Sequence, residues 1–92
     1  MYKLKFLGKA LDDLKRIDRA QQKIIKAKLM MLAKNPEALK NNIKRIGRAE
    51  DHLYRLRTGN YRVIFKKDKD QFVIIIVRIG HRKEIYVKVN MP

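Results

Sequence analysis

A chain of 92 residues with 24 lysine and arginine residues against 9 aspartate and glutamate residues carries a formal net charge of +15. The cations are interleaved with apolar residues from Lys3 to Lys88, which indicates a folded basic domain that attracts polyanions and excludes a disordered basic arm. Cysteine is absent and there are two histidines, so disulfides and thiolate metal sites are excluded and we expect no metal and no cofactor.

The length predicts one domain, residues 1–92, with a thin core, because so short a chain buries only about 60–65% of the surface that its unfolded form exposes. The longest uninterrupted apolar run, residues 72–77, is far shorter than the roughly 18–20 residues of a membrane helix. The N-terminus carries no long apolar segment. We therefore expect a soluble cytoplasmic protein that does not contact a membrane.

The first elements are predicted to be a strand and an αα-hairpin. Residues 2–6 alternate apolar and lysine side chains, which is the period of a half-buried strand, and Gly8 ends it. Apolar residues then recur at helical spacing as far as Ile17, and again after Asp18, a potential N-cap. Pro36 closes this second helix because it restricts Asn35 and cannot donate to the preceding turn. Residues 37–39 add one further turn. The apolar stripes of the two helices are Leu7, Ala10, Leu11, Leu14 and Ile17, then Ile24, Ile25, Leu29, Met31 and Leu32.

The second half of the chain predicts an antiparallel sheet. Residues 40–51 lack a clean period and are interpreted as a connection. Strands follow at residues 52–57, 61–67 and 72–79, and the last is so apolar that it is expected inside the sheet, with antiparallel neighbours throughout. The predicted fold class is α+β: an N-terminal strand, an αα-hairpin and a three-strand antiparallel meander that form one sheet, with the helices packed on one face.

Arginine side chains gather on the face of the meander opposite the core. A four-residue turn after the first of these strands pairs Arg57 with Arg62 and places Arg55 on the same face. Arg78 and Arg82 continue this alternation and join the group if the last strand pairs with residues 61–67. Half-buried cations are costly without a compensating anion, which favours a phosphate site over the alternative of a merely solvated face.

Two further residues have both a structural and a functional interpretation. His81 is either a polar loop residue or a group that transfers protons near neutral pH. Tyr86 either packs between its apolar neighbours or supplies a hydroxyl or a ring on which a base stacks. Tyr61 is expected in the core, and His52 on the apolar side of its strand.

Residues 56–63 (LRTGNYRV) and 80–86 (GHRKEIY), together with the order of the elements, resemble the RelE/ParE superfamily of bacterial toxins from toxin–antitoxin pairs. The resemblance covers nearly the whole chain and implies that family's compact fold. The second segment is more similar to RelE, which implies cleavage of mRNA in the ribosomal A site. ParE members, by contrast, act on DNA gyrase and are not nucleases.

Carried over residue by residue, the resemblance implies that Arg62 and Arg82 hold the scissile phosphate and that Tyr86 is the tyrosine near the C-terminus. Arg55 stands where RelE proteins often carry a catalytic lysine. Arginine is a poor proton acceptor, so the base is left to His81 or to the ribosome. Three further cations are predicted to contact RNA: Arg57, Arg78 and Lys83.

The resemblance thus implies a ribosome-dependent, metal-independent mRNA endoribonuclease. Its expected partners are a cognate acidic antitoxin, bound in a hetero-oligomer, and the ribosome with mRNA in the A site. Two alternatives remain open at this point. One is a ParE-like inhibitor of DNA gyrase without nuclease activity, and the other is a basic RNA-binding module without catalysis.

Overall fold

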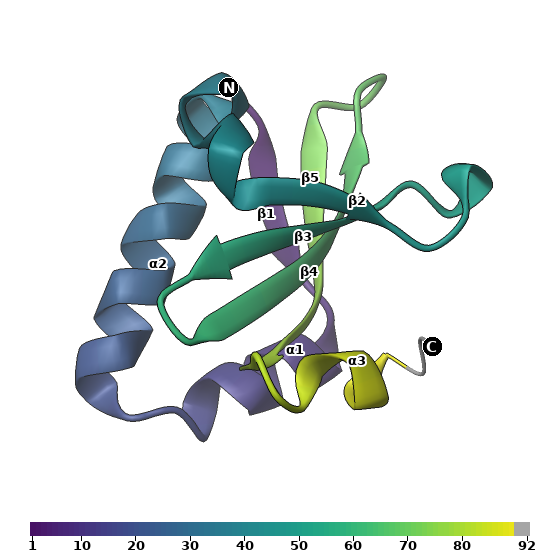
Figure 1. The fold of residues 1–92 in the computed structure, drawn as a ribbon. Helices are drawn as coiled ribbons and strands as arrows, with labels where there is room; N and C mark the ends of the chain where they lie inside the picture. Colours follow the sequence, from purple (N-terminus) through teal and green to yellow (C-terminus); the bar gives the residue numbers. More distant parts are fainter. Residues whose placement is uncertain (90–92) are drawn as a thin grey trace.

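The computed structural model describes residues 1–89 and confirms the predicted α+β class, with helices packed against one five-stranded sheet (Figure 1). The main elements are β1 (Lys3–Phe6), α1 (Gly8–Lys15), α2 (Arg19–Lys34), β2 (Ile43–Ile46), β3 (Leu53–Thr58), β4 (Tyr61–Asp68), β5 (Val73–His81) and α3 (Ile85–Lys88). Two short 3-10 helices, η1 (Pro36–Asn42) and η2 (Ala49–Asp51), flank β2. No helix of the described part is long and apolar enough to cross a membrane.

The sheet has the strand order β1-β5-β4-β3-β2, and its central meander, β3 to β5, is antiparallel as predicted. The edges differ from the prediction. β1 pairs with β5 in parallel, from Lys3 opposite Val73 to Phe6 opposite Ile76. A parallel pair needs a long connection, and here it runs through both helices and the strands β2 to β4. β2 lies within the predicted connection and pairs with β3. It is too short and too exposed to show an alternating pattern in the sequence.

Helix α2 lies against one face of the sheet (Figure 1), and the core side chains lie between the two. Asp18 caps α2 as predicted, its carboxylate accepting from the backbone N–H of Gln21 at 3.4 Å, and the helix ends before Asn35. Ala10 and Leu14 of α1 join this core. The predicted apolar stripes were too wide, since four of their members are more than two-fifths exposed: Leu7, Leu11, Ile24 and Met31.

A bulge in β5 decides which of its side chains face the core. Ile64 pairs with Arg78 and Phe65 with Ile76, so Val77 has no partner in β4. Both Ile76 and Ile79 therefore point into the core, three positions apart, and Arg78 is turned to the opposite face.

The C-terminal part of the described chain forms an element for which the sequence analysis made no prediction. Residues 85 and 86 begin α3, which packs on the face of the sheet opposite α2, over Gly80. A Cβ at Gly80 would lie 3.2 Å from Ile85 Cδ1, so glycine allows the helix to approach. The helices consequently cover parts of both faces of the sheet. His52 is exposed, with a φ of 52° before β3, and the prediction that it lies on an apolar face is wrong.

Candidate anion-binding site

An open pocket of about 430 Å³ lies on the face of the sheet opposite α2. Its lining residues come from β3, β4, the turn after β5 and α3, and they are Arg55, Arg62, Arg82, Lys83 and Tyr86. Three guanidinium groups, an ammonium group and a phenol thus converge on one space, which is the composition of a site for a phosphate or another oxyanion.

Arg62 is fixed at the centre of this positive charge. Its Nη1 donates to the carbonyl oxygens of Gly59 and Tyr61, each at 3.0 Å, so the turn between β3 and β4 orients the guanidinium. Burial lowers the pKa of Arg62, and the positive charge of Arg55 lowers it further. Tyr86 opposes this shift, and Arg57 and Arg82 add smaller contributions that lower the pKa. A bound anion would relieve this repulsion.

Arg55 has unused hydrogen-bonding capacity beside Arg62. Its Nε is buried and has no hydrogen-bond partner within residues 1–89. Arg57 pairs with Arg62 across the strands, as predicted, and is exposed at the margin of the pocket. The predicted register therefore brings Arg55, Arg57 and Arg62 together, and the turn after β5 adds Arg82 and Lys83.

Arg78 does not join the pocket, which corrects the expectation from the alternation. Its Nε and Nη2 donate to the carboxylate of Asp13 at 2.8 and 3.0 Å, and its pKa is raised chiefly by this hydrogen bonding. Asp13 is almost fully buried in α1. Arg78 therefore belongs to an ion pair outside the pocket.

His81 also lies outside the pocket. It is the cross-strand partner of Tyr61, and the two rings meet edge to face at 5.8 Å on the core side of the sheet. Its Nδ1 accepts a hydrogen bond from the backbone N–H of Lys83 at 3.2 Å. His81 is thus the last residue of β5 and not the loop residue of the first interpretation, and these contacts give its ring a structural role. Tyr61 packs against the core, as predicted.

A family model described as the ParE toxin of the type II toxin–antitoxin system parDE matches residues 4–86. The chain belongs to this family. The toxin's resemblance to the RelE/ParE superfamily is thereby confirmed. No curated protein sequence matches it significantly.

Solved structures similar to the toxin include RelE proteins. The archaeal RelE–RelB complex from Pyrococcus horikoshii matches with a TM-score of 0.73 and 25% identity, over 88% of this chain and 94% of that one. The RelB–RelE complex from Methanococcus jannaschii matches with a TM-score of 0.70 and 29% identity, over 91% and 96%. Isolated RelE from E. coli has a TM-score of 0.74 at 21% identity, over 98% and 96%, which shows the fold alone.

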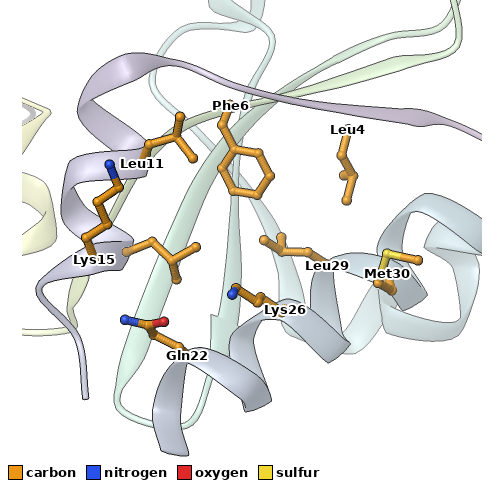
Figure 2. Close-up of a pocket in the computed structure, with 9 residues that line it drawn as sticks. Leu4, Phe6, Leu11, Lys15, Gln22, Lys26, Leu29 and Met30 are labelled. Atoms are coloured by element: carbon orange, nitrogen blue, oxygen red, sulfur yellow. The ribbon is translucent and has the colours of Figure 1, made fainter. Parts of the chain in front are cut away.

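The toxin has a second notable surface, an apolar groove of about 520 Å³ between β1, α1 and α2 (Figure 2). Leu4 and Phe6 of β1 form one wall, and Leu11 and Met30 contribute side chains that are 42% and 50% exposed. Lysines lie among the lining residues on both helices, and the full lining is Leu4, Phe6, Leu11, Leu14, Lys15, Gln22, Lys26, Leu29 and Met30.

Sequence reasoning overlooked Asp13. It occupies the helical position between Ala10 and Leu14 on the buried stripe of α1, and a carboxylate at such a position is itself a signal, because it needs a buried cationic partner. Within residues 1–89 no group of three or more histidine, cysteine, aspartate or glutamate side chains is placed to hold a metal ion.

Proposed function

We propose that the toxin is a ribosome-dependent, metal-independent endoribonuclease that inhibits translation in the cytoplasm by cutting mRNA in the ribosomal A site. The observation that carries this proposal is the pocket in which Arg55, Arg62 and Arg82 converge beside the hydroxyl of Tyr86. A phosphodiester of RNA fits such a pocket in size and in charge.

The proposed reaction uses the nucleophile that RNA carries. The 2′-oxygen attacks the adjacent phosphorus, the bond from phosphorus to the 5′-oxygen breaks, and the products are a 2′,3′-cyclic phosphate and a 5′-hydroxyl. Negative charge grows on the phosphoryl oxygens during this attack. Guanidinium groups that are already fixed, as Arg62 is by its two carbonyl bonds, stabilise that charge without reorganising.

Two proton transfers complete the reaction, from the 2′-hydroxyl to a base and from an acid to the leaving 5′-oxygen. A base must lie within hydrogen-bond reach of its proton. His81 faces Tyr61, and the arginines are poor bases, so the titratable groups of the pocket itself are Tyr86 and Lys83. We assign the transfers to these two residues together with groups of the ribosome.

Primer extension on mRNA from cells that express the toxin tests the proposal. We expect new 5′ ends within translated regions and none in a message whose start codon has been removed. Binding of ribosomes without any cleavage would instead support a non-catalytic RNA-binding module. Growth arrest with intact messages would refute the nuclease.

Independence from metal is tested on a chemically crosslinked ribosome complex, which stays assembled when EDTA removes magnesium. We expect cleavage to persist there at the rate seen with magnesium. A rate that is lost in EDTA and restored by a metal in proportion to the toxin, with ribosomes intact, would contradict a metal-independent mechanism.

The family model itself favours a second candidate function, because its description is that of a ParE toxin. ParE members inhibit DNA gyrase, and in that case Arg82 and Tyr86 would contact gyrase and not RNA. Gyrase-linked DNA breaks in arrested cells, with no new mRNA ends, would establish this alternative.

We further propose that a cognate acidic antitoxin binds the toxin in a hetero-oligomer, as RelB accompanies RelE in the archaeal complexes. The charge of +15 favours an acidic chain that folds on binding. The apolar groove, with Lys15 and Lys26 among its lining residues, suits an amphipathic acidic segment (Figure 2). Co-expression with the adjacent reading frame, followed by pull-down, should recover this partner.

Two neighbouring methionines of α2 test the groove with matched chemistry. Met30 lines it, whereas Met31 does not, and their side chains are similarly exposed at 50% and 45%. We expect Met30→Asp to weaken antitoxin binding at least tenfold and Met31→Asp to leave it nearly unchanged, since only the first places a charge on the buried surface. Equal effects of the two variants would show that the antitoxin does not bind in the groove.

A further inference from the structure

The pocket depends on α3, a helix too short to be stable without contacts to the rest of the protein. α3 has four residues, Ile85–Lys88, and one helical turn is unstable in isolation because nucleation costs more than its few hydrogen bonds return. Yet this turn carries Tyr86 into the pocket, and Lys83, which also lines the pocket, lies two residues before it. The place of both side chains is therefore decided by what α3 contacts elsewhere.

α3 contacts the rest of the toxin on the side away from the pocket. Ile85 is fully buried over Gly80. At the other end of the turn, Lys88 Nζ donates to Asp13 Oδ1 at 3.3 Å and to the carbonyl oxygen of Ile79 at 3.4 Å. Ile85 fixes one point of the helix and Lys88 a second, and two points define its direction on the sheet.

Asp13 is a rigid anchor for Lys88. Its side chain is 3% exposed, and its carboxylate also accepts from Arg78 Nε at 2.8 Å, from Arg78 Nη2 at 3.0 Å and from the backbone N–H of Ile79 at 3.0 Å. These bonds tie α1 to β5 whether or not Lys88 is present. Asp13 itself does not line the pocket.

We infer that Asp13 is a positioning residue for the anion pocket: through Lys88 it holds α3 on the sheet, and so places Tyr86 and Lys83 beside Arg62 and Arg82. The role of the pocket rests on the proposed function, whereas the placement of α3 does not. Helix α1 thus contributes to the site without touching a ligand.

The variant Lys88→Met separates positioning from folding, because it removes the ammonium group but leaves the bonds of Asp13 to Arg78 and Ile79. We expect the unfolding midpoint to change little. Hydrogen exchange at Val89, whose N–H donates to the carbonyl of Ile85 at 3.1 Å, should become about tenfold faster, and the ring resonances of Tyr86 should shift. Lys9→Met is the matched control, since Lys9 is exposed, lies on α1 and forms no ion pair in the described chain.

Binding supplies the readout that a general loss of structure would not reproduce. The probe is a trinucleotide with 2′-O-methyl groups, which cannot be cleaved. We expect Lys88→Met to weaken its binding about tenfold, the size of one lost charge-assisted contact, and to have no further effect in a Tyr86→Ala background. Lys9→Met should weaken binding equally, and only slightly, in both backgrounds.

The outcomes separate the two proposals. Unchanged Val89 exchange and Tyr86 resonances in Lys88→Met would overturn the positioning role, as would a binding loss that adds to that of Tyr86→Ala. A wild-type toxin that neither binds the trinucleotide nor cleaves mRNA on programmed ribosomes, with faster Val89 exchange in Lys88→Met, would sustain the positioning role and count against the proposed nuclease.

Discussion

Among the individual residues, Arg62 bears most directly on function because several cations converge on it. The turn holds its guanidinium. Burial lowers the pKa of Arg62, and repulsion by Arg55, Arg57 and Arg82 lowers it further, against an opposing contribution from Tyr86. Repulsion of this kind destabilises the empty pocket and favours the bound one. A pKa shifted by neighbouring charges of the same sign is typical of residues in functional sites.

Arg62→Ala and Arg82→Ala are each expected to abolish toxicity and to slow mRNA cleavage on the order of a hundredfold or more, the usual cost of removing one fixed donor from a transition state. Folding should persist, since neither side chain belongs to the core. Single-turnover cleavage on programmed ribosomes measures the effect, with the exposed α2 residue Lys23→Ala as control. If the folded variants remain fully toxic, Arg62 and Arg82 do not belong to the active site.

His81→Ala is expected to change the cleavage rate less than about threefold, because a base must lie within hydrogen-bond reach and this ring faces Tyr61. Comparison of cleavage rate and ribosome affinity in the same preparation is the appropriate measurement. A large loss of rate at unchanged affinity would return His81 to the role of proton-transfer group.

Asp13 should make the free energy of unfolding depend on pH. Burial by itself raises the pKa of its carboxyl, but the hydrogen bonds from Arg78, Ile79 and Lys88 outweigh burial and lower it below the ordinary value. The resulting stabilisation is complete above the unfolded-state pKa of about 3.9 and is lost as pH falls through the lower pKa of the folded protein.

Asp13→Asn should therefore be less stable than the wild type by about 3 kcal/mol at pH 7, the cost of breaking a buried ion pair. The difference should narrow as pH falls below about 4. Urea unfolding at a series of pH values gives both quantities. A gap that stays constant down to pH 2 would show that the Asp13 charge contributes nothing.

At the scale of elements, the approach of α3 to β5 places Tyr86 in the lining of the pocket. It is possible only because Gly80 has no side chain: a Cβ there would lie 3.2 Å from Ile85 Cδ1 and 3.3 Å from Lys88 Cδ. Ile85 is fully buried and cannot move aside freely. The glycine thus serves packing between elements, not an unusual backbone angle.

Gly80→Ala is expected to displace α3 and to destabilise the toxin by about 1–3 kcal/mol, the usual range for an added methyl group in a packed site. Cleavage should fall as well, because Tyr86 moves with the helix. Equilibrium unfolding and single-turnover cleavage together test this. Gly8→Ala is the control, because a Cβ at Gly8 would meet no atom within 4 Å. Equal, small effects of both variants would mean that α3 accommodates the methyl group.

At the scale of the molecule, a net charge of +15 on 92 residues gives a long-range attraction to RNA and to an acidic partner that no single residue accounts for. Long-range attraction accelerates encounter and is screened by salt. Contacts inside the groove act instead on dissociation.

Raising the salt concentration from 0.05 to 0.5 M should therefore slow antitoxin association at least tenfold, whereas Met30→Asp should chiefly accelerate dissociation. Stopped-flow association at several salt concentrations measures the first effect and dissociation by competition measures the second. An association rate insensitive to salt would mean that the net charge does not steer the encounter.

Local patterns were sufficient for most of the elements and for part of the site. The alternation in residues 2–6, the cap at Asp18 and the stop at Pro36 each depend on neighbours in the chain, and each was confirmed. The pairing of Arg57 with Arg62 followed from the length of one turn. β2 was missed because its two apolar residues, Ile43 and Ile46, are three apart and fit no strand period.

The sequence by itself determined the order of β1, the two long helices and the strands β3 to β5, the face on which Arg55, Arg57 and Arg62 lie, and the excess of positive charge. Periodicity and charge are properties of short segments. Only the tertiary structure decided that β1 runs parallel to β5, that β5 has a bulge at Val77, and that residues 85–88 form a helix. It also decided that Arg78 forms an ion pair with Asp13. The decisive contacts join residues 65 and 75 positions apart, from Asp13 to Arg78 and to Lys88. Contacts between residues so far apart in the chain cannot be found from a local sequence pattern.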